Sequence, residues 1–215
     1  DYTANNQDHP VIIVLDNGNY VIAWQSFGQD GSGRGVYAKI YDHTNRVVRE
    51  EFRVNTHTAS NQEFPTLAKL ADNKFIVVWQ SNQQDGSGTG IYAKIFNSDG
   101  NIKKEEFRVN SYTEDHQRSP SVTLLSDESF IITWQSQGQD GSGYGIYAKE
   151  YTKEAIPLGE EFRVNDYTKN NQESPQITAL ANGSCAIVWQ SFGQDGYKSS
   201  IYGQILTNEN NTIYD

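Results

Sequence analysis

Apolar side chains recur along this chain in short runs with a period of two. They do not follow the three- to four-residue spacing of amphipathic helices. Segment 75–80 is F-I-V-V-W-Q and segment 130–134 is F-I-I-T-W, so both carry apolar residues on successive positions. A strand that is apolar on both faces is typical of a sheet covered on both sides. These segments therefore predict buried β-strands.

Three further segments around 75–80 fit strands of the same sheet. Segment 65–70 predicts a strand entered through Pro65, where no ladder donor is lost. Segment 91–96 follows a glycine-rich loop and predicts a third strand. Segment 106–110 alternates apolar and charged residues, which is typical of an outer strand that is wet on one face. The pattern predicts about four antiparallel strands in this part of the chain.

The same pattern occurs four times, with a period of 55 residues and no insertion or deletion. The segment E-F-R-V-N occurs at 51–55, 106–110 and 161–165. Each copy also has one tryptophan, and these are Trp24, Trp79, Trp134 and Trp189. Such strict phasing predicts one module per repeat, packed against its neighbours. The expected units are 1–55, 56–110, 111–165 and 166–215, the last without the E-F-R-V-N strand.

Four-stranded units with a doubly buried centre and an amphipathic outer strand describe the blades of a propeller. Blades face one another around an axis, so inner strands are buried on two sides and outer strands on one. An open solenoid is disfavoured by the long segments between strands. The sequence predicts an all-β fold, a four-bladed β-propeller-like repeat domain formed by the whole chain.

Composition restricts the function. The 17 basic and 27 acidic side chains give a net charge of −10, which disfavours a nucleic-acid partner. No apolar run approaches the ~20 residues that cross a bilayer, so membrane insertion is not expected. Met is absent, which predicts a processed product or a segment of something longer. Cys185 takes the position of Tyr20, Phe75 and Phe130 in the other copies, which marks it as a core residue.

The order of motifs in each unit supports a resemblance. E-F-R-V-N, then a proline, then F-I-V-V-W-Q-S, then G-Q-D-G-S-G-x-G-I-Y-A-K resembles the tandem repeats of large secreted microbial adhesin-like proteins. The resemblance covers essentially the whole chain. It implies an extracellular or cell-surface, propeller-like, non-catalytic module, and it brings no catalytic residues.

The Q-D-G loops are candidate ligand and metal sites, each with a single carboxylate. These are Asp30, Asp85, Asp140 and, in an altered loop containing Tyr197 and Lys198, Asp195. Calcium prefers six to eight oxygens, so one carboxylate predicts at most weak calcium sites at Asp30, Asp85 and Asp140. The competing interpretation is a turn whose glycines take positive φ and whose Asp binds its own backbone. No cofactor other than calcium is expected.

Aromatic residues offer a second kind of candidate. The four tryptophans could stack on sugar rings, but the ends of doubly buried strands favour a place in the core between blades. The tyrosines after the loops are the better ligand-contact candidates, namely Tyr37, Tyr92, Tyr147 and Tyr202. The variable residues just after the loops are candidates too: Arg34, Thr89, Tyr144 and Ser199.

No motif for catalysis appears. The chain has no G-x-S-x-G, H-E-x-x-H or phosphate-loop segment, and its four histidines occupy unrelated repeat positions. Polar residues recur equally in all units, whereas catalysis gathers different residues asymmetrically in one place. Two sequons, at Asn182 and Asn210, are candidate glycosylation sites in a secreted protein.

These observations predict a non-catalytic extracellular module, structural or adhesive, that presents repeated loops and self-assembles. Other copies of the chain are the expected partners, because the missing E-F-R-V-N strand leaves one sheet with an open edge. The alternative is a lectin with repeated carbohydrate sites. A calcium-stabilised module and a glycan hydrolase rank behind both.

Overall fold

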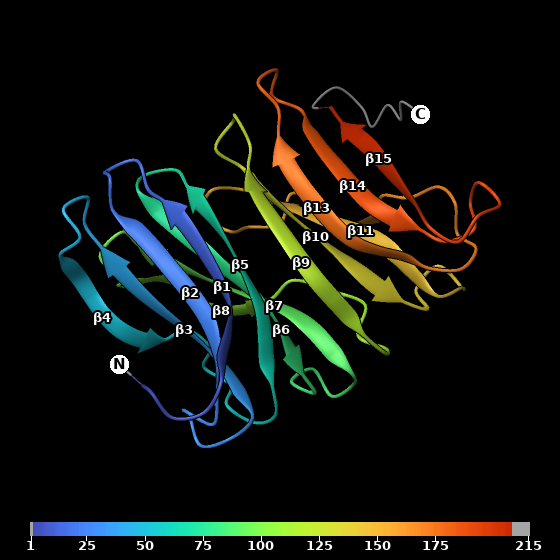
Figure 1. Ribbon diagram of the computed structural model, residues 1–215. Coiled ribbons are helices and arrows are strands. Elements are labelled where there is room, and N and C mark those ends of the chain that lie inside the picture. The colour runs from blue at the N-terminus through green and yellow to red at the C-terminus, as the bar shows by residue number, and fades with distance from the viewer. Residues whose placement is uncertain (1, 208–215) are drawn as a thin grey trace.

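The computed structural model describes residues 2–207, which form four antiparallel sheets (Figure 1). Each sheet comes from one 55-residue unit, with its strands in chain order across the sheet. The first sheet contains β1 (Gln7–Val14), β2 (Tyr20–Phe27), β3 (Arg34–Tyr41) and β4 (Val47–Arg53). The second contains β5 (Gln62–Leu70), β6 (Lys74–Asn82), β7 (Thr89–Asn97) and β8 (Ile102–Arg108).

The third and fourth sheets repeat this order with shorter outer parts. The third contains β9 (Gln117–Leu124), β10 (Phe130–Gln137), β11 (Tyr144–Tyr151) and β12 (Phe162–Arg163). The fourth contains β13 (Gln172–Ala179), β14 (Cys185–Ser191) and β15 (Ser200–Leu206). No fourth strand follows β15 within the described residues, and segment 208–215 lies outside them. None of the described elements is a helix that could span a membrane.

The first strand of each sheet lies at the centre of the molecule. β1 packs beside β5, β5 beside β9, and β9 beside β13, and the sheets fan outward from these strands (Figure 1). This arrangement of four-stranded sheets around an axis is that of propeller blades. The predicted all-β, propeller-like fold is confirmed.

The core consists of three apolar layers, one between each pair of successive blades. In the first layer, Ala23 and Ile40 of the first blade lie with Trp79 and Phe96 of the second. The next layers join the second blade to the third and the third to the fourth. Each blade thus presents its tryptophan-bearing face to the blade before it, and its opposite face to the blade after it.

Two strand boundaries differ from the expected ones. β5 begins at Gln62, three residues before Pro65, because a bulge at the proline lets the ladder continue on both sides. The outer strand of the second blade is Ile102–Arg108, earlier in the chain than 106–110. In the third blade this strand shrinks to β12, and before it only an isolated bridge joins Tyr151 to Pro157.

Candidate functional site

An axial cavity of about 370 Å³ opens where the four inner strands meet. It is lined by the proline-containing turns of the first three blades and by Ser174 and Gln176 of the fourth. All four repeats contribute to this cavity. It is therefore a place where residues from different repeats come together.

A β-bulge shapes each inner strand beside this cavity. The bulge residue has a positive φ of 53–56° in every repeat, at His9, Phe64, Ser119 and Ser174. In each repeat a proline comes next. The preceding blade fixes the bulge, because Gln25 Oε1 accepts a hydrogen bond from Phe64 N–H at 2.8 Å. Gln135 Oε1 accepts one from Ser174 N–H, also at 2.8 Å. Bulges of this kind re-aim neighbouring side chains.

The residue just before the bulge differs between the repeats in size and in charge. The four residues at this position are Asp8, Glu63, Arg118 and Glu173. Their neighbours at the start of the third strand, which include Arg34, Thr89 and Tyr144, also differ. Sequence reasoning named the second group but missed the first. The available signal was a repeat position that keeps a long or charged side chain while changing its identity. We call Asp8, Glu63, Arg118 and Glu173 the axial rim.

Arg34 joins two rim carboxylates from adjacent blades. Its guanidinium lies 3.5 Å from Asp8 Oδ2 and 3.4 Å from Glu63 Oε1. Asp8 Oδ1 also accepts hydrogen bonds from His9 Nδ1 at 3.0 Å and from Gln25 Nε2. The hydrogen bond from His9, reinforced by Gln25 and Arg34 against the opposing effect of burial, lowers the pKa of Asp8. Asp8 is therefore an ionised carboxylate at neutral pH.

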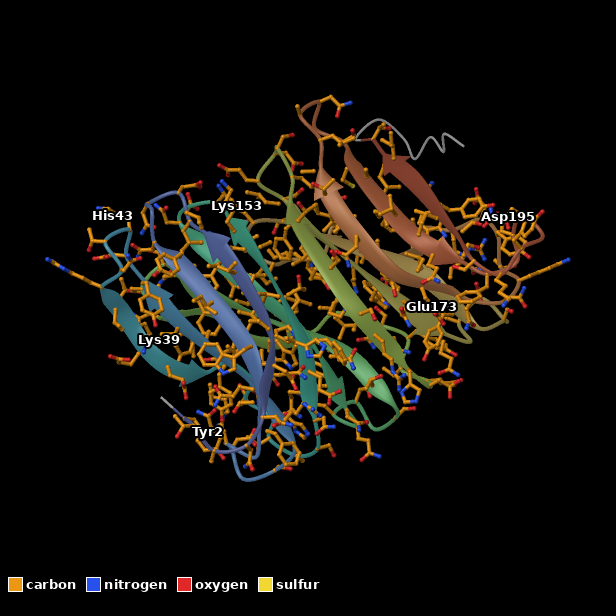
Figure 2. The ribbon with its side chains drawn as sticks, viewed as in Figure 1. Tyr2, Lys39, His43, Lys153, Glu173 and Asp195 are labelled. Atoms are coloured by element: carbon orange, nitrogen blue, oxygen red, sulfur yellow. The ribbon has the colours of Figure 1, made fainter. Side chains whose placement is uncertain are left out.

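The polar contacts continue into the third and fourth blades. Arg118 Nε donates to Thr89 Oγ1 at 3.3 Å, and Thr89 Oγ1 lies 3.1 Å from His116 Nδ1. Burial, followed by the charge of Arg118, lowers the pKa of His116, which favours its neutral form. In the fourth blade, Asn171 Nδ2 donates to Glu173 Oε1 at 2.8 Å. Glu173 follows the first residue of β13 and lies to the right of centre in Figure 2.

Exposed aromatic rings accompany the charged rim residues. Phe27 is 45% exposed and Phe64 is 42% exposed. The Arg34 guanidinium carbon lies 5.9 Å from the centre of the Phe27 ring. The ring of His9 meets that of Phe64 edge-on, with 4.6 Å between centroids. Apolar rings and charged groups therefore lie side by side at this part of the surface.

The Q-D-G loops lie at the same end of each blade but form a different environment. Asp30 Oδ1 accepts a hydrogen bond from Ser32 N–H at 3.2 Å, and Asp85 and Asp140 accept equivalent bonds. The second oxygen of each of these three carboxylates is buried without a hydrogen-bond partner. In the fourth copy, Ser200 takes the position that Gly35, Gly90 and Gly145 hold in the other copies, and its hydroxyl donates a hydrogen bond to Asp195 Oδ2. Asp195 is exposed at the far edge of the fourth blade (Figure 2).

The loop tyrosines are largely inaccessible to a ligand. Tyr37, Tyr92 and Tyr147 are buried, and burial followed by the nearby Asp raises the pKa of each to about 12. Tyr202 is half-buried. Among residues 2–207 there is no group of three or more His, Cys, Asp or Glu side chains that could hold a metal ion. Weak calcium binding at Asp30, Asp85 and Asp140 stays a prediction.

Three of the four tryptophans take part in the layers between blades, and the predicted core position is wrong for Trp24. Trp79 and Trp134 are fully buried and Trp189 is 6% exposed. Trp24 is only partly buried, because no blade covers the leading side of the first sheet. Of the two sequons, Asn182 is exposed in the turn between β13 and β14, and Asn210 lies outside the described residues.

A second cavity, of about 660 Å³, lies between the third and fourth blades. Its lining includes Cys185, Glu150 and Leu206. In the second and third blades the two corresponding positions hold stacked rings, Phe75 with Phe96 and Phe130 with Tyr151. The fourth blade has Cys185 opposite Leu206 instead, and these smaller side chains leave the space open. Burial raises the pKa of Cys185 to about 11.

Comparison with known proteins finds similar folds among solved structures but no match in sequence. No protein-family model matches the chain, and no curated protein matches it in sequence. Among solved structures, the chain is similar to a thermostable family-43 glycoside hydrolase, with a TM-score of 0.56 and 9% identity over 95% of this chain and 72% of that one. It is also similar to an endo-1,4-β-xylanase of Bacteroides thetaiotaomicron, with a TM-score of 0.57 and 9% identity over 99% and 75%.

A further similar structure is the GH93 α-L-arabinofuranosidase of Fusarium graminearum bound to arabinobiose. Its TM-score is 0.63 at 12% identity, over 93% of this chain and 57% of that one. At such identities the likeness establishes the fold.

These comparisons contradict two predictions, that the chain is a non-catalytic structural or adhesive module and that it is not an enzyme. Solved structures that share its fold include glycoside hydrolases. The prediction failed for a physical reason. It assumed that polar residues recur equally in all units, whereas the axial rim holds Asp8, Glu63, Arg118 and Glu173 at one repeat position. The four repeats therefore differ at the axial rim, and the assumption of equal polar residues in all units does not hold there.

Proposed function

We propose that this chain binds carbohydrate at the axial rim and hydrolyses glycosidic bonds there. The observation that carries the proposal is the set of unlike charged side chains at one repeat position, each directly before a bulge residue that lines the axial cavity. Glycoside hydrolases with this fold support it, and one of them is solved with arabinobiose. Arabinose- and xylose-containing polysaccharides are therefore the first substrates to test.

The rim has the groups that hydrolysis of a glycosidic bond needs. Most glycosidases use two carboxyl groups, ~5–9.5 Å apart, one as proton donor and the other as base or nucleophile. Asp8 and Glu63 lie on either side of the Arg34 guanidinium. The lowered pKa of Asp8 suits the role that requires an ionised carboxylate. Glu63 and Glu173 are the candidate proton donors.

The other polar and aromatic groups at or beside the axial rim would orient the sugar. Carboxylate, guanidinium and amide groups hydrogen-bond neighbouring hydroxyls, and the exposed rings of Phe27 and Phe64 supply apolar faces. Arg34 is held between two carboxylates and Arg118 is held by Thr89, so both guanidinium groups are preorganised. Preorganised polar groups beside a cavity are typical of ligand sites.

The test is reducing-sugar release from arabinan, arabinoxylan and xylan. We expect hydrolysis of at least one of them, and a loss of at least ~100-fold in kcat/KM in Asp8→Asn and in Glu63→Gln or Glu173→Gln. Glu128→Gln is the matched control, because Glu128 pairs with the exposed Lys153 away from the axial rim. No release from any polysaccharide by a folded, purified chain would refute the hydrolytic part.

Binding is measured separately, by affinity electrophoresis with the same polysaccharides. Removal of a catalytic carboxyl should leave retardation intact, whereas Phe64→Ala should weaken it. Retardation without hydrolysis would keep the carbohydrate partner and reject the reaction. An extracellular or cell-surface location and self-association remain predictions that neither measurement addresses.

A further inference from the structure

Within residues 2–207, the first and last blades each have one apolar face that no other blade covers. The leading face of the first blade is formed by Ile12, Val14, Tyr20, Ile22 and Trp24. The trailing face of the fourth blade is formed by Ala186, Val188, Ile201, Gly203 and Ile205. In the rest of the molecule, every leading face packs on the trailing face of the blade before it.

The uncovered residues match residues that are buried elsewhere. Val188 and Ile201 are 43% and 74% exposed, whereas their equivalents in the second blade, Val78 and Ile91, are fully buried. On the leading face, Ile12 is 62% exposed and its equivalent Leu67 is 9% exposed. A terminal repeat that faces water has a polar outer side. These two faces keep the side chains of an interface between blades.

Polar groups that join successive blades are also present at both ends. Gln25 of the first blade accepts a hydrogen bond from Phe64 N–H of the second, and Gln135 accepts one from Ser174 N–H. The equivalent acceptor on the fourth blade is Gln190, which bonds Ser199 of its own blade. The equivalent donor is His9 N–H of the first blade. The two halves of one more junction thus stand at opposite ends of the chain.

Both faces border the same gap. The inner strands contact one another in the series β1, β5, β9 and β13 and line one axial cavity, so the blades run around a common axis. The trailing face of the last blade and the leading face of the first therefore point into the interval between them. The solved structures that share the fold extend beyond the part that this chain matches, which is 57–75% of their length in the three described above.

We propose that one further four-stranded blade of this repeat type fills the gap between the fourth and first blades and closes a five-bladed ring. Its leading face packs on Val188, Ile201 and Ile205, and its trailing face covers Ile12 and Trp24. A single blade contacts both faces at once. A second copy of the chain would bring four blades into a gap that lies between the fourth and first blades of the first copy. The closing blade would also place a fifth residue on the axial rim.

One position indicates how the closing blade differs from the others. In the first three blades a glycine admits the next blade, since a Cβ on Gly88 would lie 2.2 Å from the carbonyl oxygen of Asp115. The fourth blade has Lys198 at this position. The closing blade therefore leaves room for a lysine at this corner, where an acidic side chain would pair with it.

The experiment extends the chain after residue 215 by a copy of residues 51–110, which continues the 55-residue phase. A second version carries Lys198→Gly, so that this side chain cannot obstruct docking. Acrylamide quenching reports the accessibility of Trp24, as the difference between each chain and its Trp24→Phe variant. We expect the extension to reduce the contribution of Trp24 to acrylamide quenching at least ~3-fold. Sedimentation should show that the extended chain is a monomer.

Ile201→Asp separates docking from mere extension. In the 215-residue chain Ile201 is exposed, so this change should move Tm by no more than about 2 °C. In the extended chain it should lower Tm further and restore quenching of Trp24. The proposal would be overturned if Trp24 were as accessible to acrylamide in both extended chains as it is in the 215-residue chain. It would also be overturned by a 215-residue chain that already protects Trp24, whether by self-association or by closure of its own four blades.

Discussion

The second and fourth blades have similar central strands but different surroundings. β6 and β14 share the sequence V-W-Q-S and the same pairing with the following strand. β6 has a blade on each side and is buried from Lys74 to Ser81. β14 has a blade on one side only, and its burial alternates along the strand. The comparison teaches that burial in this fold is a property of the junction between blades, so identical residues contribute differently according to their position in the ring.

The largest effect is expected from removing a tryptophan inside a junction. Trp79→Ala should destabilise the chain by about 3–5 kcal/mol, because a fully buried indole is replaced by a cavity between the first two blades. Trp24→Ala should cost less than half as much, since Trp24 is only partly buried. Urea unfolding of both variants measures the difference. Equal losses would show that the junctions do not determine burial energy.

A smaller effect is expected at the corner where one blade meets the next. Gly88→Ala places a Cβ 2.2 Å from the Asp115 carbonyl oxygen of the third blade, so backbone must move, at a cost of about 1–3 kcal/mol. Lys198→Ala is the matched change in the fourth blade and should stay within about 0.5 kcal/mol. Thermal unfolding compares the two. A neutral Gly88→Ala would contradict the close approach of the blades.

Part of this fold could be predicted from the sequence alone, and part could not. The 55-residue period, the strand pattern and the buried Trp79 and Trp134 follow from alternation and spacing, because a repeat with a blade on each side buries both faces of its central strand. Spacing could not show that Arg34 joins Asp8 and Glu63 of adjacent blades. Nor could it show the bulges at His9, Phe64 and Ser174, whose positive φ values the sequence did not reveal. Nor could it show that Trp24 lies at an open end.

Alkaline titration extends the comparison to the loop tyrosines of the first three blades. Burial, followed by a neighbouring Asp, raises the pKa of Tyr37, Tyr92 and Tyr147 to about 12, against 10 in the unfolded chain. The folded state therefore holds these protons more tightly, so their contribution is complete below pH 10 and is lost as the pH rises towards 12. Unfolding measured by urea should show stability falling in this interval.

Tyr92→Phe tests the origin of that fall. The variant has no phenol proton to lose, so the decline between pH 10 and 12 should become shallower than in the parent chain. Absorbance at 295 nm should in parallel show one fewer late-titrating tyrosine. An unchanged slope would mean that Tyr92 ionises in the folded chain as readily as in the unfolded one.

The smallest perturbation probes the one junction that lacks a stacked aromatic pair. Cys185 is 3% exposed and lines the cavity between the third and fourth blades, and burial raises its pKa from 9.0 to about 11. At pH 8 this shift alone reduces the thiolate fraction about 100-fold, and the thiolate is the reactive form. Labelling by a disulfide reagent should therefore be at least that much slower in the folded chain than in urea. Cys185→Phe restores the ring found in the second and third blades, and should raise Tm if the cavity is empty space that Phe75 and Phe130 fill in their own blades. Rapid labelling of the folded chain would instead show that this junction opens, and would make the fourth blade the least firmly held of the four.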